Sequence, residues 1–139
     1  MNHLFDAGVI DVFMSVPLHW TRRLARGYNQ AQVLIRASQS SRHHTCRVLK
    51  RVRQTRIQPL AGSTSARLRN VAGAFQIVHA DAIRGKTVAL VDDVKTTGAT
   101  LNECARVLKQ AGARHITAIV LAVAGQGRAD KVDVPVKSQ

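Results

Sequence analysis

The stretch KTVALVDDVKTTGATLNECARVLKQAGA, Lys86 to Ala113, decides the fold class. Four small apolar residues, 88–91, run directly into Asp92 and Asp93. A short, unbroken apolar run is typical of a strand that is buried on both faces of a parallel sheet. The segment from Thr100 to Gly112 then has apolar residues at helical spacing, and its glycine favours a C-terminal stop. The stretch therefore predicts a buried strand, a polar loop and an amphipathic helix.

Similar patterns lie on both sides of this stretch. Val9–Val16 and His115–Ala124 are apolar runs that predict strands, and Tyr28–Ser41 has helical spacing. The shorter segments 46–52 and 72–78 also have strand character. Strands that alternate with helices indicate the α/β class, with a mainly parallel sheet flanked by helices.

The length of 139 residues is typical of one domain, and 45% apolar residues are enough for a core. We therefore expect a single domain over residues 1–139, with a core of about residues 9–124 and a polar, frayed tail over 125–139. Arg53 to Asn70 is polar and basic, which predicts a long mobile loop with a short helix at Ser65–Asn70.

The charge balance is strongly basic, with 21 Lys and Arg against 8 Asp and Glu, a formal net charge of +13. Such a surface attracts polyanions, although a basic surface without a dedicated partner remains the alternative. The first residues lack the basic start of a signal peptide, and no apolar run approaches the roughly 18 residues of a membrane span. The two cysteines form no metal-binding or CxxC spacing. We expect a cytoplasmic protein without membrane insertion.

The polar loop after the central strand has the composition of a phosphate-binding site. In an open parallel sheet, ligands bind at the carboxyl ends of the strands, where Asp92 and Asp93 stand. A helix begins after them, and helix N-termini attract anions. Gly98 permits close approach of the backbone, and hydroxyl groups come from Thr96, Thr97 and Thr100.

A ribose 5-phosphate fits this combination of groups. The loop would hold the phosphate, and the two carboxylates would accept hydrogen bonds from the ribose hydroxyls and stabilise positive charge that develops on the sugar. A diphosphate leaving group would then need Mg²⁺ and basic side chains. The alternatives are weaker, since a P-loop NTPase needs GxxxxGK[ST] and a dinucleotide fold needs GxGxxG after the first strand, and neither is present. Asp92 as a simple turn or capping residue is the remaining alternative.

Two sets of residues carry a resemblance to a known family. The segment ALVDDVKTTGAT resembles the signature of type I phosphoribosyltransferases that binds phosphoribosyl pyrophosphate (PRPP). Upstream, Pro17-Leu18, Arg26-Gly27-Tyr28-Asn29-Gln30 and the segments RQTRIQPL and ARLRNVAGAF resemble the competence-associated ComF/GntX family of phosphoribosyltransferase-like proteins. The resemblance covers roughly residues 12–124.

This resemblance implies a type I phosphoribosyltransferase core and a role for individual residues. Asp92 and Asp93 would be catalytic and bind the ribose, and the ribose 5-phosphate site as a whole would comprise Asp92, Asp93, Lys95, Thr96, Thr97, Gly98, Ala99 and Thr100. The turn after Val16 would be the pyrophosphate loop, and 53–70 would close over the site. Candidates for the pyrophosphate end are Arg22, Arg23, Arg26 and Arg67.

The chain also departs from the family pattern. Members usually begin with a four-cysteine zinc ribbon, which this sequence lacks, so we expect an N-terminally shortened core without a metal site built from protein ligands alone. Mg²⁺ would arrive with PRPP. An acidic residue is common in the family where this chain has Ala66, and this difference bears on catalysis more than on phosphate binding.

Two functions follow from these observations. The first is an enzyme that transfers a 5-phosphoribosyl group from PRPP to a nitrogen acceptor that the sequence does not identify. The second is a non-enzymatic protein of competence that binds single-stranded DNA, for instance through the basic stretch 42–56, beside a vestigial PRPP site. Because Trp20 and Tyr28 are the only aromatic residues nearby, such binding would be mainly electrostatic. Interaction with competence proteins alone is a third possibility.

Overall fold

The protein is described by a computed structural model that covers residues 10–17, 35, 44–45, 47–55, 63–95, 98–123 and 131–133. The predicted helix over 28–41 lies outside these residues except for Ile35. No helix in the described part is both long and apolar enough to cross a membrane.

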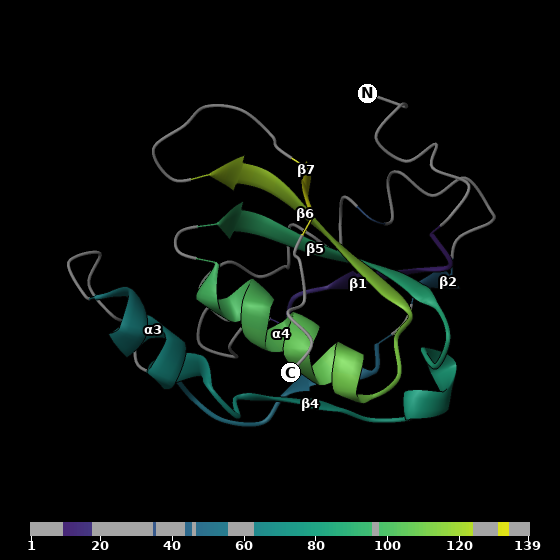
Figure 1. Cartoon of the computed structure of the whole chain (residues 1–139), viewed down its shortest axis with the longest axis horizontal. Coiled ribbons are helices and arrows are strands. Elements are labelled where there is room, and N and C mark those ends of the chain that lie inside the picture. Colours follow the sequence, from purple (N-terminus) through teal and green to yellow (C-terminus); the bar gives the residue numbers. More distant parts are fainter. Residues whose placement is uncertain are drawn as a thin grey trace.

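A five-stranded sheet forms the centre of the molecule (Figure 1). Its order is β2-β1-β5-β6-β7, and β5 is the central strand. The strands are β2 His44–Thr45, β1 Val12–Ser15, β5 Thr87–Lys95, β6 His115–Val123 and β7 Lys131–Asp133. The first four run parallel to one another. The predicted α/β class with a mainly parallel sheet is therefore confirmed.

The edge strand β7 differs from the expectation. It pairs antiparallel with β6, with Ile119 opposite Lys131 and Thr117 opposite Asp133. The prediction that the chain after residue 124 is a frayed tail is therefore wrong for these three residues. An edge strand is held by main-chain hydrogen bonds to a single neighbour, so it does not need the apolar run that marks the buried strands.

The helix α4, Ala99–Gln110, follows β5 and packs against one face of the sheet (Figure 1). Its buried face includes Leu101, Cys104 and Leu108, which follow the predicted 3–4 residue spacing. Its start and end agree with the predicted helix to within two residues. Because α4 runs back along the sheet, its first turn lies at the carboxyl end of β5 and its last turn lies near the beginning of β6.

A second, two-stranded antiparallel sheet lies beside α4 and consists of β3, Leu49–Arg51, and β4, Phe75–Ile77. The chain between these strands contains the helix α3, Thr64–Val71. This helix is longer than the predicted Ser65–Asn70, and its N-cap is Ser63, whose hydroxyl accepts a hydrogen bond from the Ala66 amide at 3.2 Å. A 3₁₀ turn, η2 at Ala80–Ala82, then leads into β5.

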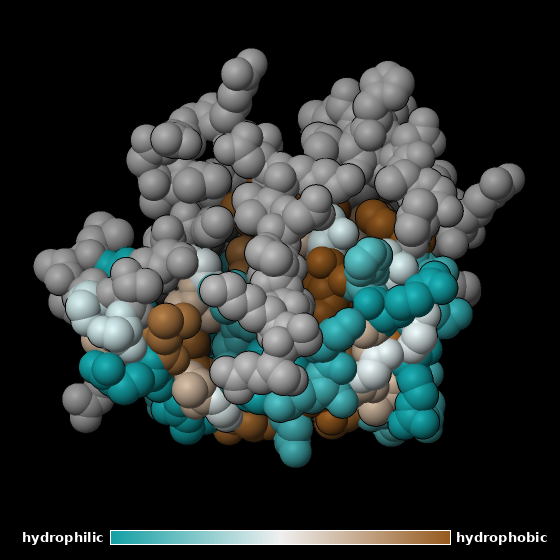
Figure 2. Space-filling view, viewed as in Figure 1, coloured by the Kyte–Doolittle hydropathy of each residue, from teal (hydrophilic) through white to brown (hydrophobic). Residues whose placement is uncertain are grey.

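Few large apolar side chains are exposed in the described part of the chain. The exposed ones are Val52 and Leu68. The described surface in Figure 2 is a mixture of hydrophilic and hydrophobic residues. Most of the other large apolar side chains that the structure describes are buried, on the two faces of the sheet or in the β3–β4 hairpin. This distribution is the one expected for a folded domain whose strands are covered on both sides.

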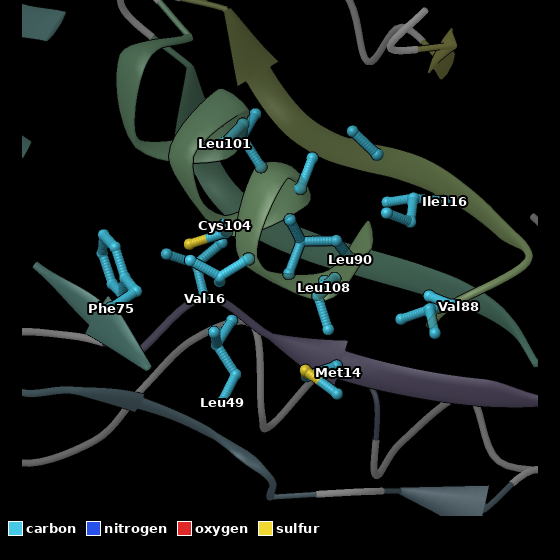
Figure 3. Packing of buried hydrophobic residues seen from close by; sticks show 14 of the residues in the cluster. Met14, Val16, Leu49, Phe75, Val88, Leu90, Leu101, Cys104, Leu108 and Ile116 are labelled. Carbon is cyan, nitrogen blue, oxygen red and sulfur yellow. The ribbon is translucent and has the colours of Figure 1, made fainter. Parts of the chain in front are cut away.

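The larger core lies between the sheet, α4 and the β3–β4 hairpin (Figure 3). Met14, Leu90 and Leu108 are at most 1% exposed and contribute to it from β1, β5 and α4. The residues that alternate with these in the strands, such as Phe13 and Val91, form a smaller cluster with Ile35 on the opposite face. The alternation puts Asp92 on the α4 side, since it is two residues beyond Leu90.

Candidate functional site

The acidic pair lies within the last part of β5 rather than after it, because the strand continues to Lys95. Asp92 is half-buried, and the side chain of Asp93 lies outside what the structure describes. The strand β1 ends beside this point, since the Val16 amide donates to the Val91 carbonyl at 2.9 Å. The chain after Val16, predicted to be the pyrophosphate loop, therefore begins next to Asp92.

The start of α4 lies a few residues further along the chain. Gly98 occupies the N-cap position with φ of 75°, a left-handed conformation that glycine adopts without strain. Its carbonyl accepts the first helical hydrogen bond, from the Asn102 amide at 2.8 Å. A glycine has no side chain with which to cap the helix, and the first turn of α4 contains no acidic residue. The described first turn therefore presents no carboxylate that would repel an anion at the positive end of the helix dipole.

The two helices differ at their starts. The hydroxyl of Ser63 caps α3, whereas the N-cap residue of α4, Gly98, has no side chain that could do the same. Ala99 is buried and Thr100 is half-buried in the first turn of α4. Thr96 and Thr97 lie outside the described residues, as do Arg22, Arg23 and Arg26. Of the predicted 5-phosphate loop, the structure thus describes the helical half.

Arg51 is a further candidate for the site that the sequence analysis did not single out. It ends β3, its guanidinium carbon lies 5.3 Å from the centre of the Phe75 ring, and its Nη2 donates to the hydroxyl of Thr55. The strand alternation was the available signal, because Arg51 stands on the same side of β3 as the buried Leu49. A basic residue on the core side of a strand is unusual enough to indicate a specific role.

The pKa of the buried Cys104 thiol depends on the charges of both Asp92 and Arg51. Burial raises the pKa of Cys104 above its ordinary value, and the negative charge of Asp92 raises it further. The positive charge of Arg51 acts in the opposite direction on the same pKa. Asp92 of the central strand and Arg51 of the hairpin therefore act in opposite directions on the pKa of the same thiol. Cys104 itself is a neutral residue of the core.

The chain segment between the hairpin strands is fixed at its base. Arg53 Nη2 donates to the carbonyls of Asn70 and Ala72, at 2.9 and 2.6 Å, and so binds the C-terminal end of α3. The amides of Val52 and Arg53 both donate to the Ala74 carbonyl, at 2.9 and 3.4 Å. The predicted closing loop of 53–70 is thus held at both of its ends.

Glu103 links the chain just after α3 to the helix α4. Its Oε1 accepts a hydrogen bond from the Gly73 amide at 2.8 Å, and its carboxylate is paired with Arg106 at 2.7 and 2.9 Å. Only 8% of Glu103 is exposed. The hydrogen bond from Arg106 holds the pKa of the Glu103 carboxyl below its ordinary value, against the opposing effect of burial. The sequence signal for this role was an acidic residue on the apolar face of a predicted helix.

Arg67 lies in α3 and is half-buried. Of the four arginines predicted for the pyrophosphate end, it is the one that the structure describes. It lies in the segment whose ends are held by the hydrogen bonds of Arg53 and Glu103. In the part of the chain that the structure describes, no three His, Cys, Asp or Glu side chains gather as a metal site would require.

Comparison with known proteins identifies the fold and the family. The model of the phosphoribosyl transferase domain matches residues 47–139. The chain therefore belongs to the phosphoribosyltransferase family. Its arrangement is similar to that of glutamine PRPP amidotransferase from B. subtilis, with a TM-score of 0.50 and 22% identity over 86% of this chain and 24% of that one. At that identity the likeness shows the fold alone.

Two curated proteins are more similar in sequence. Competence protein F of Haemophilus influenzae is 38% identical over 111 residues, which are 76% of this chain and 47% of that protein. The DNA utilization protein YhgH of Escherichia coli is 36% identical over 110 residues, 76% of this chain and 46% of that protein. The resemblance to competence-associated members is thus confirmed, and the chain spans about half the length of the curated relatives it matches.

Proposed function

We propose that this protein binds PRPP with Mg²⁺ at the carboxyl end of β5 and transfers the 5-phosphoribosyl group to a nitrogen acceptor. The observation that carries the proposal is the placement of Asp92 on the α4 side of β5, a few residues before α4 begins at its N-cap glycine, Gly98. Membership of the phosphoribosyltransferase family supports the ligand class.

Different residues would bind different parts of PRPP. The carboxylates of Asp92 and Asp93 would accept hydrogen bonds from the ribose hydroxyls. Backbone amides and hydroxyls from Lys95 to Thr100 would hold the 5-phosphate at the positive end of the α4 dipole. Arg67 and the arginines Arg22, Arg23 and Arg26 would face the diphosphate, as would Arg51 at the end of β3.

The transfer itself breaks the bond between C1 of the ribose and the diphosphate oxygen and forms a bond from C1 to nitrogen. The nitrogen loses a proton, and pyrophosphate leaves. Positive charge develops on the sugar as the old bond breaks, and the carboxylate of Asp92 stabilises it because the charge is close and partly shielded from water.

Mg²⁺ fits this donor set through the ligand rather than through a cage of protein groups. Magnesium retains several waters and is commonly bound by one or two carboxylates together with substrate phosphates. Asp92 or Asp93 would be the protein's carboxylate for it. Bound there, the cation would neutralise the diphosphate. The predicted closing segment 53–70, held at its base by Arg53, would exclude water from the reacting sugar.

The test is a calorimetric titration with PRPP and Mg²⁺, with the variant Asp92→Asn and a matched control, Asp81→Asn. Asp81 is an exposed carboxylate at the other end of the sheet. We expect the parent and Asp81→Asn to bind PRPP equally and Asp92→Asn to lose most of the binding. Equal binding by all three proteins would contradict the proposed site. Pyrophosphate release with candidate nitrogen acceptors would then test the transfer.

A second function is favoured by the charge of the chain. The relatives bear the names competence protein F and DNA utilization protein, and this chain has a net charge of +13. We therefore propose that it also binds DNA in a competence context, in the cytoplasm. Asp92→Asn separates the two functions, because it should remove PRPP binding and leave DNA binding intact.

A further inference from the structure

A second concentration of charge lies at the opposite end of the sheet, where β5 and β6 begin. Two turns meet there, one from η2 into β5 and one from α4 into β6. They and the end of α4 carry five exposed basic or histidine side chains, which we call the amino-end surface: Arg84, Lys86, Lys109, Arg114 and His115. Parallel strands place their beginnings together, so residues that are distant in sequence converge at this end.

Backbone hydrogen bonds hold the two turns together. The Gly85 amide donates to the Gly112 carbonyl at 2.8 Å, and the Arg114 amide donates to the Lys86 carbonyl at 2.9 Å. Lys109 Nζ donates to the Arg114 carbonyl at 3.2 Å, which brings the last turn of α4 into the same surface. The bases of these side chains are therefore fixed relative to one another before any partner binds.

Arg84 belongs to the same surface by its packing. A Cβ built on Gly112, which has φ of 96°, would lie 3.2 Å from Arg84 Cγ. The stem of Arg84 thus lies against the second turn. Among the acidic side chains that the structure describes, those near this surface offset little of its charge, because Asp81 contacts Arg84 at 3.4 Å with both side chains largely exposed, and Asp11 is half-buried and accepts the Thr87 amide.

We propose that the amino-end surface binds the phosphate backbone of double-stranded DNA. This inference rests on the second proposed function and gives it a location and a preferred form of DNA. The location is the end of the sheet opposite to Asp92, rather than the 42–56 stretch. A PRPP molecule and a DNA duplex would then occupy separate ends of one domain.

The chemistry of the surface favours a duplex over a single strand. Single strands are held by stacking their bases on aromatic side chains as well as by charge. The two aromatic residues that the structure describes, Phe13 and Phe75, are buried in the two cores. Cations without aromatic partners respond to phosphate density, which is greatest along a duplex.

The same surface is poorly suited to a membrane. Binding at a lipid interface usually combines basic residues with an apolar anchor. Among the described residues, the exposed large apolar side chains are Val52 and Leu68, which follow β3 and lie in α3 rather than in the two turns.

The test measures the anisotropy of a fluorescent duplex of random sequence between about 50 and 200 mM salt. The variant is Lys86→Ala/Arg114→Ala, and the matched control is Lys50→Ala/Arg69→Ala, which removes the same charge from the hairpin and α3. All four side chains are exposed, so both variants should melt as the parent does. We expect Lys86→Ala/Arg114→Ala to weaken binding and to flatten the log–log salt slope by about two, and the control to keep the slope of the parent.

Other results would contradict the binding of DNA, its location on the amino-end surface, or the preference for a duplex. A parent protein that binds no duplex at low salt removes the second function itself, while leaving PRPP binding untouched. Binding that is unaffected by Lys86→Ala/Arg114→Ala, or is equally weakened in the control, places the DNA elsewhere. Tighter binding of a single strand of the same length excludes the duplex as the preferred partner. Displacement of the duplex by anionic phosphatidylserine vesicles at equal phosphate concentration would favour a membrane.

Discussion

The two ends of the sheet hold charge in different ways. At the carboxyl end, Asp92 and Arg51 are half-buried, and both act on the pKa of the buried Cys104 thiol. At the amino end, the basic side chains are exposed, and the acid that contacts Arg84 is 93% exposed. Charges that are partly removed from water interact strongly at short range, whereas exposed charges are screened by salt. The first arrangement suits one small charged ligand, and the second suits a polyanion.

One helix connects these ends. The first turn of α4 lies at the proposed phosphate site, and Lys109 in its last turn belongs to the amino-end surface. Between them, Glu103 fixes the base of the segment that contains α3. Damage to the core beneath α4 should therefore affect both ends, whereas changes at either end should remain local.

The largest expected effect comes from the shared core. Leu90 is completely buried, and Leu90→Ala should lower the free energy of unfolding by about 2–5 kcal/mol because it leaves a cavity. Urea denaturation measures this loss, and the binding of PRPP and of DNA should weaken together. The control Val52→Ala, at a position that is 57% exposed, should change stability by less than about 0.5 kcal/mol. Equal stability of the two variants would contradict the assigned core.

A smaller effect is expected from the glycine that begins α4. Gly98→Ala places a Cβ on a residue with φ of 75°, which should cost about 1–2 kcal/mol and weaken PRPP binding. Gly85→Ala is the matched control, because Gly85 has φ of 69° at the other end of the sheet and no atom within 4 Å of its added Cβ. It should show a similar loss of stability in thermal melts and unchanged PRPP affinity. A parallel loss of affinity would show that strain, rather than the site, is responsible.

The stability that the link between α4 and the segment containing α3 provides should depend on pH. In Glu103→Gln the charge pair with Arg106 is lost, and we expect a loss of about 1 kcal/mol at neutral pH. The folded pKa of Glu103 is lowered, so its contribution is fully present above the ordinary value of 4.5 and is lost as the pH falls through the folded pKa. The difference in stability between parent and variant should therefore shrink below pH 4.5. A difference that stays constant with pH would show that the ionised carboxylate is not what stabilises this link.

The smallest expected effect concerns Asp81. Its contact with Arg84 is exposed, so Asp81→Asn should leave the stability unchanged within about 0.5 kcal/mol. The same change removes the acidic side chain that contacts Arg84, so duplex binding at low salt should become slightly tighter. Fluorescence anisotropy would detect this change, and weaker binding would contradict the assignment of Arg84 to the amino-end surface.

The sequence predicted the central elements well, because they are marked by burial. The apolar runs before Asp92 and from His115 onwards appear as β5 and β6, and the spacing of Leu101, Cys104 and Leu108 gave α4 within two residues. The alternation along these strands is hidden in the sequence because both faces are apolar. For this reason the sequence did not show that Asp92 lies on the α4 side.

Features that depend on main-chain pairing or on distant contacts were not predicted. The edge strand β7 has three residues and no apolar run, and the convergence of Lys86 with Arg114 depends on how two turns meet. The bond between Gly73 and Glu103 joins residues 30 apart. The predicted roles of all the site residues remain predictions, for the ribose 5-phosphate site Asp92, Asp93, Lys95, Thr96, Thr97, Gly98, Ala99 and Thr100, and for the pyrophosphate end Arg22, Arg23, Arg26 and Arg67.

The most direct test of two separate sites measures the binding of both ligands, PRPP and a DNA duplex, by each of two variants. The melting shift caused by PRPP with Mg²⁺ and the anisotropy of a DNA duplex are measured for Asp92→Asn and for Lys86→Ala/Arg114→Ala. A ligand that binds the folded state alone raises the melting temperature. We predict that Asp92→Asn loses the PRPP shift and keeps duplex binding, and that Lys86→Ala/Arg114→Ala shows the reverse. Loss of both ligands in either variant, with the unliganded melting temperature unchanged, would contradict two separate sites.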